Sequence, residues 1–157
     1  MVLERIISGG QTGVDRAALD AALDAGMSCG GWCPKGRKAE DGLIDPRYPL
    51  EEAPSAEYAM RTQWNVRDSE GTLILTVGEP TGGTALTVLL ADRMGKPFRL
   101  VDLQQAEAMP PVAEWITANK MSILNIAGPR ESTLPGIYSQ AAEFVRRLLA
   151  HLESADR

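Results

Sequence analysis

Three glycine-rich segments of the chain have the composition of loops that bind anionic ligands. The first is GGQTG at 9–13, the second is GEPTGGT at 78–84, and the third is GPRES at 128–132. Glycine has no Cβ, so a ligand can approach the backbone closely at these positions. Where a helix follows, its first N–H groups are unpaired and attract phosphate, and threonine or serine hydroxyls add further donors.

Each segment by itself is also compatible with a tight turn from a strand into a helix. Their occurrence together favours a shared site for a phosphate-bearing ligand. The residues that we expect to bind this ligand are Gly9, Gly10, Gln11, Thr12, Gly13, Thr81, Gly82, Gly83, Thr84, Gly128, Arg130, Glu131 and Ser132.

A long polar segment, residues 28–49, adds a second group of candidate ligand residues. Lys35 and Arg37 have the charge to pair with a phosphate, and Trp32 has a flat ring on which a ligand ring can stack. The alternative is a solvated basic loop with Trp32 packed against the core. A loop of this length is often functional in a compact domain, so we include all three residues in the predicted site.

Asp15 and Arg61 complete the predicted site. Asp15 falls in the first turn of a predicted helix. There its carboxylate either stabilises the helix by interacting with the helix dipole, or holds a cation or a ligand hydroxyl. Arg61 and Asn65 are four residues apart and share one face of another predicted helix, for which the alternative is a surface of ion pairs. No catalytic residue is predicted, because no G-x-S-x-G elbow or Cys–His pair is recognisable. A non-catalytic binding protein is therefore favoured, with an enzyme left open.

Several common functions lack their characteristic patterns in this sequence. GGQTG is not G-x-G-x-x-G, and no G-x-x-x-x-G-K-[ST] occurs, which argues against classical dehydrogenases and P-loop NTPases. Two cysteines, Cys29 and Cys33, and one histidine, His151, are too few for a closed zinc site, so no metal site is predicted. The formal net charge of −5 argues against nucleic acid as a partner.

The apolar pattern alternates between strands and helices along the whole chain. It predicts strands at 5–8, 29–32, 72–77, 98–101 and 122–127, and helices at 14–25, 55–68, 84–94, 110–119 and 136–151. This alternation indicates an α/β fold: a single Rossmann-like three-layer domain over residues 1–157, with a mostly parallel sheet of about five strands. The carboxyl ends of parallel strands share one edge, where all three glycine segments are then expected.

The bulk properties indicate an ordinary globular protein. Apolar residues make up 44% of the 157 residues, and no apolar run approaches the roughly 18 residues of a membrane span. The first residues lack the pattern of a signal peptide, and two cysteines do not make a disulfide scaffold. We therefore expect a cytoplasmic protein with no membrane partner.

The motifs taken together resemble one family. The stretches IISGGQTGVDRAALDAAL, GGWCPKGRKAEDG, NVRDSEGTLIL, TGGT and LNIAGPRES, with Arg61-Thr62, are similar to the molybdenum cofactor carrier family. These Rossmann-like proteins belong to a wider group that includes the LOG phosphoribohydrolases, formerly misnamed lysine decarboxylases. The resemblance runs from about Ile6 to the last predicted helix, and the combination is specific although each stretch alone is not.

The resemblance implies a pocket formed by the three glycine segments. Its cargo would be the molybdenum cofactor (molybdopterin, a phosphorylated pterin), and molybdoenzymes would be the partners that receive it. We therefore expect a carrier that binds a phosphate-bearing pterin or nucleotide-like ligand, in a homo-oligomer as relatives with this fold commonly form. The alternative is a LOG-like nucleotide phosphoribohydrolase or a nucleotide-sensing domain. LOG enzymes have P-G-G-x-G-T-x-x-E, whereas TGGTALT at 81–87 lacks the glutamate. This weakens the hydrolase alternative unless Asp15, Asp41 or Glu131 supplies the carboxylate.

Overall fold

A five-stranded parallel sheet forms the centre of the protein. The computed structural model describes residues 2–105 and 107–156. The sheet contains β1 (Arg5–Ile7), β2 (Ser28–Gly30), β7 (Gly71–Thr76), β8 (Phe98–Asp102) and β9 (Ile123–Ala127), in the order β2-β1-β9-β7-β8. Every neighbouring pair in this sheet is parallel. The predicted α/β fold with about five parallel strands is therefore confirmed.

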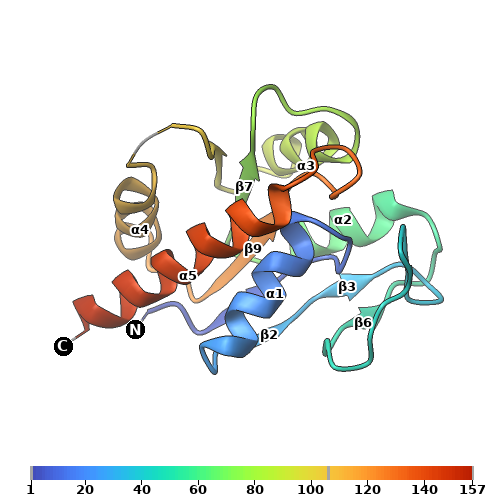
Figure 1. Cartoon of the computed structure of the whole chain (residues 1–157), viewed down its shortest axis with the longest axis horizontal. Helices are drawn as coiled ribbons and strands as arrows, with labels where there is room; N and C mark the ends of the chain where they lie inside the picture. Colours follow the sequence, from blue (N-terminus) through green and yellow to red (C-terminus); the bar gives the residue numbers. More distant parts are fainter. Residues whose placement is uncertain (1, 106, 157) are drawn as a thin grey trace.

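Helices cover both faces of the sheet (Figure 1). On one face, α1 (Val14–Asp24) packs against α5 (Ile137–Ala155), which also contacts α4 (Met109–Ala118). On the other face, α2 (Tyr58–Arg67) packs against α3 (Gly82–Arg93). Right-handed crossovers explain the division, because the chain moves along the sheet in opposite directions on the two faces.

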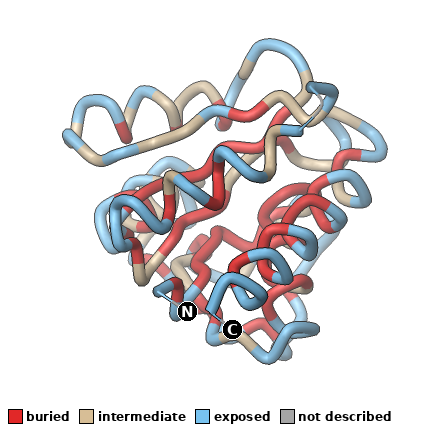
Figure 2. Tube along the Cα trace, turned by 90° about the vertical axis from the view of Figure 1, so that its left-hand side faces the viewer, coloured by how far each residue is buried: buried red, intermediate tan, exposed pale blue. Residues whose placement is uncertain are grey.

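The core lies between the sheet and these helices (Figure 2). All six residues of β7, the sequence GTLILT, are buried, as expected of a central strand covered on both faces. The helix α1 buries the alanines Ala17, Ala18, Ala21 and Ala22. Their small side chains let α1 approach α5 closely.

The strand order brings the three glycine segments together. From β1 the chain continues to β2 at one edge of the sheet, and from β7 it continues to β8 at the opposite edge. Strand β9 lies between β1 and β7. The segments at 9–13, 128–132 and 78–84 follow these three adjacent strands. This is the topological switch point of the sheet, where α/β proteins bind ligands.

The segment between β2 and α2 is more regular than the predicted loop. Two short strands, β3 (Trp32–Cys33) and β6 (Glu51–Glu52), pair in parallel, and β4 (Lys38–Ala39) with β5 (Gly42–Leu43) forms a hairpin. The predicted strand at 29–32 is interrupted at Gly31, whose φ of 123° is a conformation that favours glycine. A Cβ at Gly31 would also overlap the Ser8 backbone.

Two predicted helix starts differ from the structure by more than one residue. The helix α2 begins at Tyr58 with Glu57 as N-cap, so the predicted start at Ser55 was wrong; the Ser55 hydroxyl instead accepts the Glu57 N–H. The helix α3 begins at Gly82, two residues before the predicted start, with Thr81 as N-cap. Gly82 and Gly83 consequently lie in the first turn of α3. Within the described residues, no helix is both long and apolar enough to cross a membrane.

Candidate functional site

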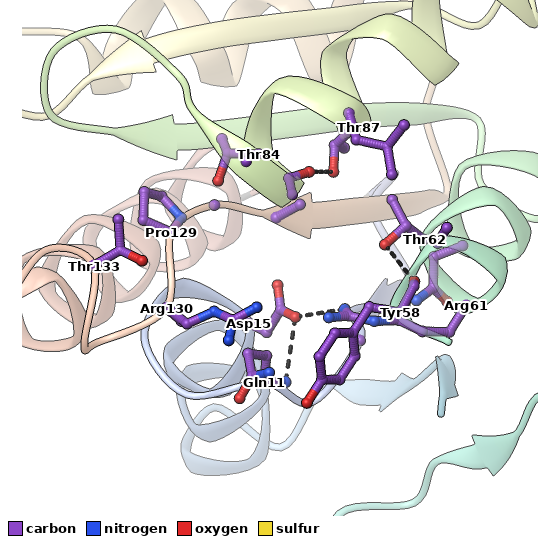
Figure 3. A pocket seen from close by; sticks show the side chains of 18 of the residues that line it. Gln11, Asp15, Tyr58, Arg61, Thr62, Thr84, Thr87, Pro129, Arg130 and Thr133 are labelled. Atoms are coloured by element: carbon purple, nitrogen blue, oxygen red, sulfur yellow. Dashed lines mark hydrogen bonds and ion pairs between the residues drawn. The ribbon is translucent and has the colours of Figure 1, made fainter. Parts of the chain in front are cut away.

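A pocket of about 320 Å³ lies at the carboxyl edge of the sheet, where the glycine segments meet (Figure 3). Its volume is within the range of small-molecule sites. The structure places most of the predicted ligand residues in its lining: Gly9, Gln11, Asp15, Arg61, Thr81, Gly82, Gly83, Thr84, Gly128, Arg130 and Ser132. These residues follow β1 and β9 or belong to α1, α2 and the N-terminal end of α3, so the tertiary structure assembles them from distant parts of the sequence.

The first turn of α3 provides open hydrogen-bond donors to this pocket. The Thr81 carbonyl accepts the N–H groups of Thr84 and Ala85, whereas those of Gly82 and Gly83 have no partner among the described residues. Both glycines are exposed, so these N–H groups are accessible from the pocket. Two unpaired amides at the positive end of a helix favour a phosphate or another anion.

A buried ion pair forms the opposite wall of the pocket. Arg61 Nη1 lies 2.8 Å from Asp15 Oδ2, and the Gln11 N–H donates to the same oxygen over 3.2 Å. Burial raises the pKa of the Asp15 carboxyl, while the positive charge of Arg61 and its hydrogen bond act in the opposite direction. The second carboxylate oxygen accepts no hydrogen bond from the described residues and points into the pocket in Figure 3.

Gly9 is required by this ion pair. A Cβ at residue 9 would overlap the Arg61 guanidinium group, which passes directly over the Gly9 backbone. The Gly9 backbone does not adopt a positive φ, so the requirement is for space and not for an unusual conformation. Gly128 is restricted in a similar way, because a Cβ there would overlap the Leu75 carbonyl and the Val14 side chain.

Glu40 connects the first and third glycine segments. Its carboxylate accepts hydrogen bonds from the hydroxyl of Thr12 and from both the hydroxyl and the N–H of Ser132. Arg130 Nη1 lies 3.8 Å from the same carboxylate. Desolvation alone would raise the pKa of Glu40, but the hydrogen bonds from Ser132 and Thr12 outweigh it and lower the pKa. No local pattern predicts this role of Glu40, because Glu40 lies 28 residues from Thr12 and 92 from Ser132.

Four predicted residues lie near the pocket without lining it. The backbone of Gly10 accepts a bond from Arg16, and Gly13 packs so closely on the Pro129 carbonyl that a Cβ would overlap it. The hydroxyl of Thr12 is used by Glu40. The Glu131 carboxylate accepts the N–H groups of Gly136 and Tyr138 and thereby caps the start of α5.

The three predicted residues of the long loop lie outside the pocket lining. The guanidinium of Arg37 donates to four backbone carbonyls, those of Ile44, Asp45, Tyr48 and Leu50. Trp32 donates through Nε1 to Asp68 over 2.7 Å and packs edge-on against Trp64. Lys35 is exposed, and its backbone N–H donates to the Ser55 carbonyl. Arg37 and Trp32 therefore have structural contacts that hold the loop against the rest of the protein.

The pocket also contains residues that sequence reasoning did not select, above all Tyr58. Three cations surround its ring, with Lys38 Nζ 5.2 Å, Arg130 Cζ 5.4 Å and Arg61 Cζ 5.6 Å from the centroid. A usable signal existed, since Tyr58 lies one helical turn before Arg61. The other additions with polar side chains are Thr62, Asn65, Thr87, Asn125 and Thr133.

The donor set of the pocket suits an anion better than a metal ion. Among the described residues, no group of three or more His, Cys, Asp or Glu side chains is placed to hold a metal. Cys29 and Cys33 are buried, and burial raises the pKa of both thiols. The buried amide nitrogen Nε2 of Gln11 has no partner among the described residues, although Gln11 lines the pocket. A ligand oxygen is the natural acceptor for this N–H group.

Comparisons with known proteins give one family and one solved structure. The model of the circularly permuted YpsA SLOG family matches residues 6–149. The chain is also similar to a crystal structure from Syntrophus aciditrophicus named "Putative molybdenum carrier protein", with 42% sequence identity and a TM-score of 0.89. This similarity covers 94% of the present chain and 96% of the other. No curated protein matches the sequence.

Proposed function

The chain belongs to the circularly permuted YpsA SLOG family, and from this we propose that it binds a phosphate-bearing pterin or nucleotide-like ligand at the carboxyl edge of the sheet. The family that the motifs predicted is confirmed by this match and by the similarity to the protein named a molybdenum carrier. The molybdenum cofactor is the cargo that we propose, with molybdoenzymes as the receiving partners.

One observation carries this proposal. The pocket collects donors that have no hydrogen-bond acceptor among the described residues, namely the Gly82 and Gly83 amides of α3 and the Nε2 group of Gln11. The guanidinium of Arg130, which lies 3.8 Å from the Glu40 carboxylate, adds a positive charge to the lining. The buried Nε2 group of Gln11 is costly to leave without an acceptor, which a ligand would supply, whereas the exposed Gly82 and Gly83 amides are accessible to a ligand oxygen. A phosphate at the start of α3 would satisfy the two amides, and Thr84 would add a hydroxyl.

The neighbouring groups suit the ring of such a ligand. Tyr58 provides an aromatic side chain at the rim, and the free oxygen of Asp15 accepts a ligand N–H or hydroxyl group. Pterins and nucleotides both combine a phosphate with a flat ring that carries N–H groups. When bound, the molybdenum cofactor would supply its metal to the receiving enzyme, while the present chain would contribute binding and shielding from water.

The test is native mass spectrometry of the protein freshly purified from its own host, compared with the same sample after denaturation. A released mass that matches a molybdopterin would support the carrier function and identify the cargo. A nucleotide mass would instead favour the alternative below. If the protein is empty, a thermal-shift panel of phosphorylated compounds follows, in which a ligand at about 100 times its Kd adds roughly 2.7 kcal/mol. No shift with any pterin or nucleotide would contradict the proposal.

Asp15 favours a second candidate, a LOG-like nucleotide phosphoribohydrolase. A buried carboxylate with a free oxygen and a raised pKa has the properties of a general acid or base. The missing glutamate of the 81–87 segment counts against this activity. Release of free base from a nucleoside monophosphate, abolished by Asp15→Asn, would establish it. Binding without turnover would leave a carrier or a nucleotide-sensing domain.

We further propose one domain over residues 1–157, a cytoplasmic location and self-association through α3. The self-association rests on the pattern of burial in this helix: Thr84, Thr87 and Ala91 are buried, whereas Leu89 is 42% exposed. Leu100 on the adjacent strand β8 is 45% exposed. Analytical ultracentrifugation of the wild type and of Leu89→Glu tests this. A single species of the same mass for both would contradict self-association through α3.

A further inference from the structure

Glu40 occupies an anion-binding position formed by residues of two glycine segments. Its carboxylate accepts the Thr12 hydroxyl, the Ser132 hydroxyl over 2.5 Å and the Ser132 N–H over 3.2 Å. Arg130 Nη1 adds a positive charge 3.8 Å away. Hydroxyl, amide and guanidinium donors that converge on one point are the usual partners of a phosphate group. Here the protein fills the position with a carboxylate of its own.

Glu40 is presented by a short hairpin. It lies with Asp41 at the turn between β4 and β5, which pair through Ala39 and Gly42. The backbone N–H of Glu40 donates to Gln11 Oε1 over 2.9 Å, and Asp41 forms an ion pair with Arg16. Beyond these contacts the turn is exposed, so the carboxylate can withdraw without disturbing the core.

The position of Glu40 lies at the junction of two cavities. Arg130 and Ser132 line the ligand pocket, whereas Thr12 and Asp41 line a neighbouring cavity of about 640 Å³. Glu40 joins the two linings through its bonds to Ser132 and Thr12. Withdrawal of Glu40 would open the smaller pocket toward the larger cavity. It would also free the four donors that now surround its carboxylate, which are the Thr12 hydroxyl, the hydroxyl and N–H of Ser132, and the Arg130 guanidinium.

We propose that Glu40 is an internal substitute for a second anionic group of the ligand, which displaces it from Thr12, Arg130 and Ser132 and releases the β4–β5 hairpin. This inference rests on the proposed function, because it concerns the same ligand pocket. The first anionic group lies at the start of α3, where the amides are open. The second group replaces Glu40, since two anions cannot share these donors without strong repulsion. The ligand class is therefore a molecule with two anionic groups, such as a diphosphate.

The experiment compares wild type, Glu40→Gln and Asp41→Asn by calorimetric titration with inorganic phosphate. Glu40→Gln removes the competing charge and is expected to bind phosphate at least about tenfold more tightly than the wild type, which corresponds to 1.4 kcal/mol. Asp41→Asn removes a carboxylate from the same turn, together with its ion pair to Arg16, but leaves Glu40 on these donors, so it is expected to gain much less phosphate affinity than Glu40→Gln. Adding Ser132→Ala to Glu40→Gln is expected to remove the gain. Equal or weaker binding by Glu40→Gln would overturn the proposal.

Hydrogen exchange of the wild type gives a readout that does not depend on a variant. Phosphate or pyrophosphate at saturation is expected to speed exchange of the amides at 38–43, because the hairpin is released. Unchanged or slower exchange would overturn the proposal. The two proposals can fail separately. If no organic phosphorylated ligand binds, but Glu40→Gln still gains phosphate affinity through Ser132, the proposed function is wrong and the inference about Glu40 stands.

Discussion

Arg61 Nη1 lies 2.8 Å from Asp15 Oδ2, and this ion pair joins helices on opposite faces of the sheet. The side chains of Arg61 and Asp15 are only 11% and 5% exposed. The bond passes over Gly9 at the end of β1, at the edge where ligands bind in α/β proteins. The pair therefore contributes at once to the cohesion of the two layers and to the wall of the ligand pocket.

Arg61→Ala is expected to lower the free energy of unfolding by about 3–5 kcal/mol, because it leaves the Asp15 carboxylate buried without its partner. Urea denaturation followed by circular dichroism measures the change. Arg67→Ala is the matched control, since Arg67 lies on the same helix in an exposed pair with Asp68 and is expected to have a far smaller effect. A loss for Arg61→Ala as small as that of the control would show that the pair is not important for stability.

Gly9→Ala is expected to destabilise the protein by about 1–3 kcal/mol, because the added methyl group overlaps the Arg61 guanidinium. The same substitution made in the Arg61→Ala background is expected to cost much less, since the overlapping group is gone. Denaturation of the four proteins of this cycle measures the coupling. Gly83→Ala is a suitable control, because nothing lies within 4 Å of a Cβ there. Equal costs in both backgrounds would contradict the steric explanation.

Arg130→Ala is expected to weaken binding of a phosphorylated ligand by about 1.5–3 kcal/mol, the value of a hydrogen bond to a charged group. Folding stability is expected to change by less than about 0.5 kcal/mol, because the side chain is 37% exposed. Calorimetric titration with the ligand found by mass spectrometry measures the affinity. Lys35→Ala is the control, since Lys35 does not line the pocket. If Lys35→Ala weakens binding and Arg130→Ala does not, the ligand lies over the long loop instead.

Tyr138 is expected to stay neutral up to high pH. Burial raises its pKa to about 12, and the hydrogen bond that its hydroxyl donates to Asp20 acts in the same direction. Because the folded pKa exceeds the ordinary value of 10.0, the contribution to stability is present below pH 10 and is lost as the pH rises through about 12. Tyrosinate absorbance of wild type minus Tyr138→Phe measures this titration, and Asp20→Asn is expected to shift it to lower pH. A difference titration centred near pH 10 would contradict the assignment.

The sequence by itself determined the five strands of the main sheet, the five helices and the chemistry of the glycine segments. Hydrophobic periodicity is a local property, so the strands and helices, and the placement of GGQTG, TGGT and GPRES after strands, are predictable from neighbouring residues. Helix starts are less predictable: α3 begins at Gly82, after Thr81 as N-cap, two residues before the start that the apolar periodicity predicts. The family was recognisable for a related reason, since its motifs are contiguous stretches.

Only the tertiary structure decided which of these residues meet. The order β2-β1-β9-β7-β8, which places β9 between β1 and β7, arises from crossovers and packing between distant segments. The bond between Asp15 and Arg61 spans 46 residues, and that between Glu40 and Ser132 spans 92. Side chains such as Arg37 have the right charge for a ligand, but tertiary contacts direct the guanidinium to backbone carbonyls. The type and charge of a residue are known from the sequence alone, whereas the partner of its side chain depends on the whole fold.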